Sequence, residues 1–459
     1  MGKKLPGLVI NSYGFANFAK AIMLSLALNY YAIFLTDVAL IAAVHMGTLM
    51  LVTHFVDAVS IPIIGSLIQK TRMRWGKFRS WFLFMPLSTC IFFTLTFTNL
   101  PLSYGLKLIC LGMAYMVAHI SLNFAYNAHL GMISILSTSV EDRLHLSTRN
   151  IQFGMASSIV YSLAVIPLLT HLTDKNPTWG YFFTVGVLSV FQIFGYWNLF
   201  YQTRDYEKYD PSLKPDASSE ISFREMVAQV LSNRQLLFLI SADTMTNVSL
   251  FSLHTLAIYY FKYVSNLEVW MAYHTLGLSI VSFLSSLLSP YVVKKFGKKR
   301  TYLIAVGWST TAFLFLRVFG ASSPYIYTTI LCLSGIISGT SGPMRQAMYM
   351  DAAEYGYYKT GKDASAFIMS LFTIPIKVGI AIATTLAGYG LALIGYVPGI
   401  QATPEFTSSL MDIICFIPAA CGGVAMAIMS FYSLTEGNLG RYMTANRIKR
   451  AQVHQSDRI

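Results

Sequence analysis

The residues of this chain that could do chemistry are charges placed inside long apolar runs. Lys20, Asp57, Arg149, Asp243 and Lys377 each lie within such a run. A charge at the centre of a transmembrane helix costs about 2.5–3.5 kcal/mol on insertion scales, so a retained one calls for a reason. Carboxylates at this depth usually handle protons or cations. We therefore predict that Asp57 binds a coupling ion, with Asp243 as a second candidate for that role.

Polar side chains also follow one face of an apolar run. His119, Asn123 and Asn127 recur every four residues, so they face one way on a helix, and Tyr126 flanks them. Asn247 lies four residues after the charge at 243. Together with Lys20 and Arg149, these residues predict a central cavity that binds a polar substrate. The alternative is that Asn and His only hydrogen-bond a neighbouring helix, and that the two cations snorkel or form structural pairs.

The elements that must position these residues are membrane helices. Of the 459 residues, 55% are hydrophobic and 12% are charged, about half the charge of a typical soluble domain. A bilayer-spanning helix needs about 20 apolar residues. Twelve runs meet that length, near 10–38, 41–68, 80–99, 105–132, 147–172, 178–202, 233–262, 267–293, 301–319, 323–350, 364–394 and 406–433.

This order predicts an all-α membrane protein of twelve transmembrane helices in two pseudo-symmetric halves. We expect a six-helix half at 1–202, a cytoplasmic linker at 203–232, a second six-helix half at 233–433 and a cytoplasmic tail at 434–459.

Basic residues concentrate in alternate loops, above all at 70–79 (KTRMRWGKFR) and 294–300 (KKFGKKR). The net charge of +13 is thus the signature of cytoplasmic loops rather than of nucleic-acid binding, and it places both termini in the cytoplasm. Each of the two loops follows the second helix of its half and contains a glycine turn, which indicates an internal repeat.

We expect this side of the molecule to carry residues that control the conformational change. In the first loop these are Arg74, Gly76 and Lys77. Asp351 and Glu354, at the cytoplasmic end of the run 323–350, are expected to form salt bridges between the halves.

The motifs of enzymes are missing from the sequence. It contains no HExxH, no GxSxG and no pair of cysteines with metal spacing. Residues 356–362 have the Walker A spacing, but Asp363 replaces the required Ser or Thr. We predict a transporter rather than an enzyme, without cofactor or metal, and a membrane-embedded enzyme or sensor stays a remote alternative.

Longer stretches of the sequence resemble the glycoside–pentoside–hexuronide:cation symporters, the group of the melibiose permease within the major facilitator superfamily. The matching stretches are Tyr13-Gly14-Phe15, Lys20, Tyr30-Tyr31, Thr36-Asp37, Phe55-Val56-Asp57-Ala58, Arg74-Trp75-Gly76-Lys77-Phe78, Glu141-Asp142-Arg143, Arg149, Glu354-Tyr355-Gly356, Lys359-Thr360-Gly361, Lys377 and Ile394-Gly395-Tyr396-Val397-Pro398.

The resemblance implies cation-coupled sugar or glycoside uptake by alternating access, in a monomeric, multi-pass protein of a bacterial inner membrane. It matches Asp57 to a cation-site carboxylate and Lys377 to a lysine near that site. It also matches Arg149 to a pocket arginine and Asn123 to a residue that contacts sugar hydroxyls.

The departures from the family pattern point to an altered solute. Ala21 and Ile61 stand where the melibiose permease has carboxylates, and Asn127 and Gly342 replace stacking aromatics. The cavity would hold excess positive charge, which an acidic sugar such as a glucuronide or hexuronide would neutralise. We predict proton rather than sodium coupling. A carrier of an amphiphilic or lipid-like anion on the same fold is the alternative.

Overall fold

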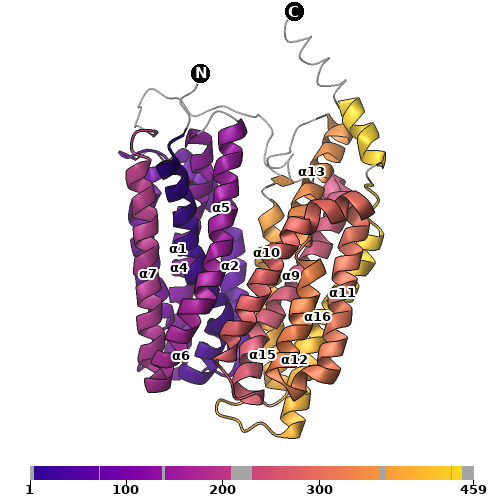
Figure 1. The fold of residues 1–459 in the computed structure, drawn as a ribbon. Coiled ribbons are helices and arrows are strands. Elements are labelled where there is room, and N and C mark those ends of the chain that lie inside the picture. Colours follow the sequence, from indigo (N-terminus) through magenta and orange to yellow (C-terminus); the bar gives the residue numbers. More distant parts are fainter. Residues whose placement is uncertain are drawn as a thin grey trace, which may run out of the picture. The chain divides into compact units, whose positions relative to one another are not determined.

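The computed structural model describes residues 5–71, 73–136, 140–207, 230–361, 368–369, 371–435 and 437–446. These residues form helices joined by turns and short loops, and no strand occurs among them (Figure 1). The predicted all-α class is therefore confirmed. Most of the predicted linker, residues 208–229, and the tail beyond 446 lie outside the described residues.

The helices begin and end close to the predicted runs. The first half contains α1 (Gly7–Ile33) with the π-helical turn η1 (Phe34–Val38), α2 (Ala43–Lys70), α3 (Arg79–Thr96), α4 (Tyr104–Leu136), α5 (Val140–Val160), η2 (Tyr161–Val165), α6 (Ile166–Lys175) and α7 (Pro177–Gln202). The second contains α9 (Arg234–Tyr259) with η3 (Tyr260–Val264), α10 (Trp270–Phe296), α11 (Lys298–Phe319), η4 (Gly320–Ser322), α12 (Pro324–Ser338), α13 (Ser341–Thr360), η5 (Leu371–Thr373), α15 (Ile374–Leu393) and α16 (Pro404–Ser430).

In the described part of the chain, ten helical spans are long and apolar enough to cross a membrane. The two other predicted runs, 80–99 and 323–350, correspond to α3 and to α12 followed by α13. The apolar helix α12 has 15 residues, shorter than a bilayer requires, so a crossing there must use part of α13. The predicted count of twelve transmembrane helices thus requires that these two segments also cross the membrane.

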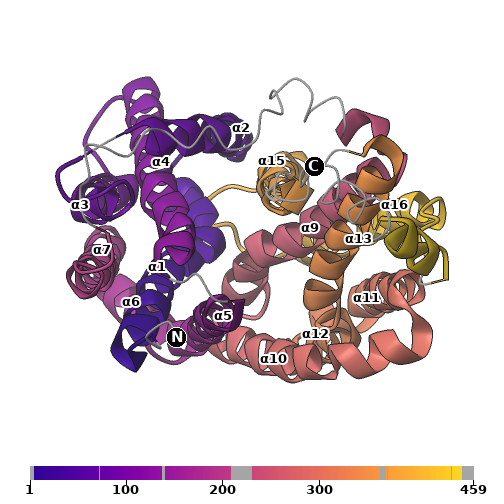
Figure 2. The same cartoon turned by 90° about the horizontal axis from the view of Figure 1, so that it is seen from above.

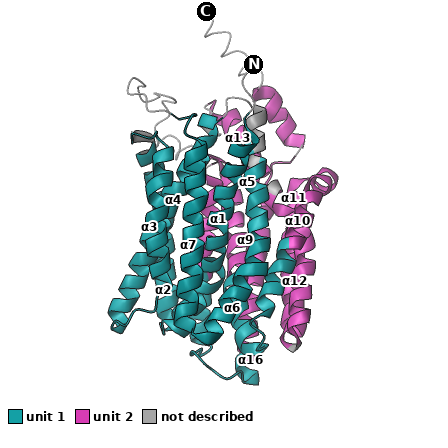
Figure 3. Ribbon diagram, turned by 60° about the vertical axis from the view of Figure 1, so that its left-hand side comes forward, with its two compact units in different colours: residues 1–216, 254–279, 384–406 teal, residues 217–253, 280–383, 407–459 magenta. Residues whose placement is uncertain are grey.

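The chain forms two compact units that do not follow its halves (Figure 3). Unit 1 comprises residues 1–216, 254–279 and 384–406, and unit 2 comprises 217–253, 280–383 and 407–459. Unit 1 therefore contains the end of α9, the start of α10 and the end of α15 in addition to the first six predicted helices. The division of the chain into halves at 202 and 233 stays a prediction.

Within unit 1, α1 packs against α5 and α7, α3 packs against α4 and α7, and α2 packs against α4 (Figure 2). Small residues allow the close approaches, since a Cβ on Gly195 of α7 would lie 2.8 Å from the Cβ of Ala19 on α1. This use of small residues at interfaces is typical of membrane helices, where van der Waals packing replaces the hydrophobic effect.

Unit 2 has its own apolar cluster, to which α9, α11, α13 and α16 contribute. Leu239, Tyr302, Met348 and Met429 are buried there. A Cβ on Gly379 of α15 would lie 2.5 Å from the Cβ of Asn247, so glycine allows α15 to contact the α9 backbone directly.

Two pairs of turns show the internal repeat in the backbone. Gly76 and Gly297, the glycines of the two basic loops, both have positive φ, at 110° and 77°. Glycine adopts this conformation without a steric cost. The turns η1 and η3 form a second pair, and each is followed by a non-glycine residue of positive φ, Leu40 at 58° and Asn266 at 50°.

Candidate substrate and coupling site

The Asp57 carboxylate is buried between α2 and α4 in unit 1. Asp57 is 1% exposed, and its Oδ1 accepts a hydrogen bond of 2.5 Å from the Nδ2 of Asn123. The same amide nitrogen lies 3.3 Å from the hydroxyl of Ser60, which donates to the Asp57 carbonyl at 2.7 Å. The helix α2 thus presents Asp57 and Ser60 to one amide of α4.

Two histidines and a tyrosine extend this polar region by one helical turn. His54 lies three residues before Asp57, and its Nε2 is 3.3 Å from the hydroxyl of Tyr115. The Tyr115 ring stacks on His119 with centroids 4.0 Å apart, and the Nδ1 of His119 is 3.1 Å from the Tyr115 carbonyl oxygen. His119 and Asn123 therefore do share a face of α4, and that face lies against α2.

Two cations of the predicted substrate site also belong to unit 1. The ammonium of Lys20 on α1 lies 3.3 Å from the centroid of the Tyr126 ring on α4, which is a cation–π contact. The Arg149 guanidinium on α5 is exposed and donates to the amide oxygen of Gln152 at 3.3 Å. Asn127, half-buried, donates to the Asn123 carbonyl at 2.9 Å.

The Asp243 carboxylate forms a buried ion pair in unit 2. Asp243 on α9 is 1% exposed and is paired with the guanidinium of Arg345 on α13. The Tyr349 hydroxyl donates to its Oδ2 at 3.3 Å, and the Asn247 side chain donates to its carbonyl at 2.7 Å. Lys377, half-buried on α15, lies two residues before Gly379, where α15 contacts Asn247.

Some of the predicted site residues thus belong to the same unit, and others belong to different units. Asp57, Lys20 and Arg149 belong to unit 1, whereas Asp243 and Lys377 belong to unit 2. The roles predicted for them stay predictions.

Sequence reasoning missed several partners of these residues: His54, Ser60, Tyr115, Arg345 and Tyr349. Arg345 could have been predicted from the sequence, because, like Asp243, it is a charged residue inside a predicted apolar run, here 323–350. The sequence evidence for His54 is weaker: it lies one helical turn before Asp57 on the same run.

The basic loop of the first half is organised by Glu207, which follows α7. Its carboxylate accepts hydrogen bonds from the backbone N–H of Phe78, at 3.0 and 3.2 Å, and of Arg79, at 3.0 Å. These N–H groups stand at the start of α3 and have no acceptor within the helix, and a negative charge is favourable at this end. A Cβ on Gly76 would lie 2.6 Å from this carboxylate. Glycine is therefore required at 76 for space as well as for φ.

Other members of this loop lie closer to solvent. Arg74 is exposed, and Lys77 is half-buried with its ammonium 5.2 Å from the centroid of the Phe78 ring. In the second half, the Lys298 ammonium pairs with Asp351 at 2.5 Å, and the Asn446 side chain donates to the Glu354 carboxylate at 2.8 Å. The structure therefore gives Asp351 a partner within its own half of the chain and Glu354 a partner in the predicted tail.

Comparison with known proteins agrees with this architecture. The profile of the MFS/sugar transport protein family matches residues 12–436, and the chain belongs to that family. The chain is thus a transporter of the major facilitator superfamily, not an enzyme.

Three curated relatives align along nearly the whole chain. An uncharacterized symporter of Bacillus subtilis, YjmB, is 29% identical over 93% of this chain and 92% of its own length. The isoprimeverose transporter of Lactiplantibacillus pentosus is 26% identical over 92% and 88%. The glucuronide carrier protein homolog of Escherichia coli is also 26% identical, over 92% and 90%.

The fold recurs among solved structures. A bacterial homolog of the human lysosomal transporter Spinster superimposes with a TM-score of 0.65 at 13% identity, over 96% of this chain and 97% of that one. The predicted major facilitator fold is therefore confirmed.

Proposed function

We propose that this chain imports an acidic sugar or glycoside, of the glucuronide or hexuronide class, together with a proton. The observation that carries the proposal is the charge of the predicted site. In unit 1 this site holds two cations, Lys20 and Arg149, and one carboxylate, Asp57. In unit 2 the Asp243 carboxylate is paired with Arg345.

A solute that carries one carboxylate complements this balance. The guanidinium of Arg149 is exposed and offers the planar fork that binds a carboxylate through two parallel hydrogen bonds. Tyr126, held against Lys20, and the half-buried amide of Asn127 offer a ring face and hydrogen bonds for a sugar. The relatives named for a glucuronide and for isoprimeverose support a sugar, and the former supports an acidic one.

Asp57 is the residue we assign to coupling. Its carboxylate accepts a hydrogen bond from the Asn123 amide, which also contacts the Ser60 hydroxyl. One carboxylate can carry one proton. Coupling then requires that the inward-opening step occurs only when both the proton and the solute are bound.

Uptake into membrane vesicles tests the proposal. The panel contains a neutral glycoside, the matching glucuronide, a free hexuronate and an amphiphilic anion, each at two pH values and with or without sodium. We expect uptake of the acidic sugars, faster at the lower external pH and indifferent to sodium. Uptake of only the neutral glycoside would refute the charge argument. Uptake of only the amphiphilic anion would establish the alternative cargo.

Arg149→Lys and Arg149→Gln form the matched pair of variants. If Arg149 binds a carboxylate through its fork, Lys should retain little affinity although it keeps the charge. We expect both variants to raise KM for the glucuronide at least tenfold, since a hydrogen bond to a charged group contributes about 1.5–3 kcal/mol. An unchanged KM in both would remove Arg149 from the site.

A further inference from the structure

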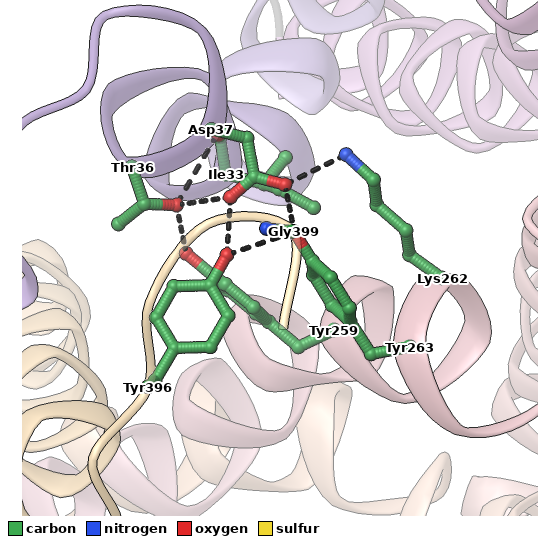
Figure 4. A network of polar contacts seen from close by, with 8 residues as sticks. All are labelled: Ile33, Thr36, Asp37, Tyr259, Lys262, Tyr263, Tyr396 and Gly399. Carbon is green, nitrogen blue, oxygen red and sulfur yellow. Dashed lines mark hydrogen bonds and ion pairs between the residues drawn. The ribbon is translucent and has the colours of Figure 1, made fainter. Parts of the chain in front are cut away.

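One carboxylate in unit 1, outside the site described above, gathers donors from three separate segments. Asp37 lies in η1, and its Oδ2 accepts from the ammonium of Lys262 at 2.7 Å and from the hydroxyl of Tyr263 at 2.5 Å, both in η3 (Figure 4). Its Oδ1 accepts from the hydroxyl of Thr36 at 2.8 Å and from that of Tyr396, in the loop after α15. The Asp37 side chain is 6% exposed.

A second layer of hydrogen bonds ties the donors to each other (Figure 4). The hydroxyl oxygens of Tyr396 and Tyr263 lie 3.1 Å apart, and the backbone N–H of Gly399 donates to the Tyr263 oxygen at 3.3 Å. The hydroxyls of Thr36 and Tyr259 lie 3.1 Å apart. We call Thr36, Asp37, Tyr259, Lys262, Tyr263, Tyr396 and Gly399 the Asp37 cluster.

The cluster joins equivalent turns of the internal repeat. The π-helical turns η1 and η3 each close with two matching backbone bonds: Ala39 to Phe34 and Ile41 to Leu35 in one, Ser265 to Tyr260 and Leu267 to Phe261 in the other. The two turns thus share one backbone conformation but have complementary side chains. The first supplies the acceptor, Asp37, and the second supplies the donors Lys262 and Tyr263.

The cluster therefore fastens the end of the first predicted helix to segments from the second half of the chain. In unit 1, η1 and the basic loop 70–79 lie at opposite ends of α2, and the charge of that loop predicts that the side of η1 is the outside. In a carrier that alternates between two sides, segments of the two halves must separate to open each side. Opening here would take the Asp37 carboxylate away from Lys262, Tyr263 and Tyr396 together.

We propose that the Asp37 cluster is the latch that holds this transporter closed toward the outside, with the Asp37 carboxylate as its centre. The proposal rests on the transport function proposed above. The several donors converge on one group, so a change of the carboxylate weakens every bond to it, whereas removal of one phenol leaves the bonds from the other donors to Asp37.

Distance measurements between spin labels test the latch without any solute. Cysteines at Ala42 and Leu267, both exposed and in unit 1, would carry the labels in a background whose five native cysteines are replaced. We expect one short distance population in the parent. Asp37→Asn should raise the ratio of long to short distances at least tenfold, because a hydrogen bond to a charged group contributes about 1.5–3 kcal/mol. Tyr396→Phe should raise it less.

The matched control is Asp412→Asn, which removes an ion pair at 2.6 Å with Arg317 in unit 2 and should leave the ratio unchanged. Lys262→Gln keeps the proposal testable if Asp37→Asn fails to fold, and should also lengthen the distances. Unchanged distances in Asp37→Asn, or in Lys262→Gln and Tyr396→Phe together, would overturn the latch. Because no solute is present, the latch can fail while glucuronide uptake succeeds, and the reverse.

Discussion

Removal of Arg345 is expected to destabilise the protein far more than removal of Arg345 and Asp243 together. The variant Arg345→Met leaves a carboxylate that is 1% exposed without its cation. Deleting one member of a buried ion pair costs about 3–5 kcal/mol, mainly because the other charge stays buried. The hydroxyl of Tyr349, 3.3 Å from Oδ2, compensates weakly, so we expect a value near 3 kcal/mol, the lower end of that range.

The double variant Asp243→Asn/Arg345→Met should recover most of this loss. It leaves no charge at the site, and replacing a buried pair by neutral groups of similar volume is often neutral for stability. The assay is unfolding by SDS in mixed micelles, followed by the fluorescence of the six tryptophans. The matched control is the pair Arg317 and Asp412, whose side chains are 31% and 42% exposed. Its removal should cost below about 1 kcal/mol.

Additive losses in the double variant would refute the pairing of Asp243 with Arg345. Transport by the same double variant separates two roles. If it concentrates solute as the parent does, Asp243 is structural and Asp57 carries the coupling. If it folds and exchanges solute but no longer concentrates it, the coupling role first predicted for Asp243 is restored.

Three further predictions concern the stability of the protein. Glu207→Gln should lower stability by about 1 kcal/mol in the same SDS assay, because the start of α3 loses its carboxylate acceptor; an unchanged midpoint would refute this role. Gly388→Val should destabilise the protein by more than Gly423→Val, a site in α16 with open space, since a Cβ at Gly388 would lie 2.6 Å from the Gly47 Cα; equal midpoints would contradict the close contact. Burial raises the pKa of the Glu268 carboxyl, against the effect of Lys262. Stability should therefore fall as the pH rises from the ordinary glutamate pKa, about 4.3, through the raised value. Glu268→Gln should flatten this part of the pH profile, and an identical profile would contradict it.

The fold was readable from the sequence because its determinants are local. Apolar length fixes where helices lie, and the basic loops at 70–79 and 294–300 follow from the same pattern. The glycines at 76 and 297 were recognised as a repeat from their positions, and both have positive φ. The irregular elements were not predicted, since π-helical turns such as η1 depend on the fit between packed helices rather than on composition.

The candidate site was readable in its residues but not in its partners. Asp57 and Asn123 were selected separately, and only the packing of α2 on α4 shows that one donates to the other. Arg345 and Glu207 act on residues 102 and 129 positions away, at Asp243 and Phe78. Such pairs are set by tertiary structure, so a single sequence cannot assign them.

The most direct test of the account is accumulation of a glucuronide in vesicles under an imposed proton gradient, with the parent and Asp57→Asn compared. We expect the parent to concentrate the solute when the outside is acidic, and to reach only equilibrium with a sodium gradient at equal pH. Asp57→Asn should exchange solute across the membrane without concentrating it. Accumulation by Asp57→Asn against the solute gradient would contradict the central claim.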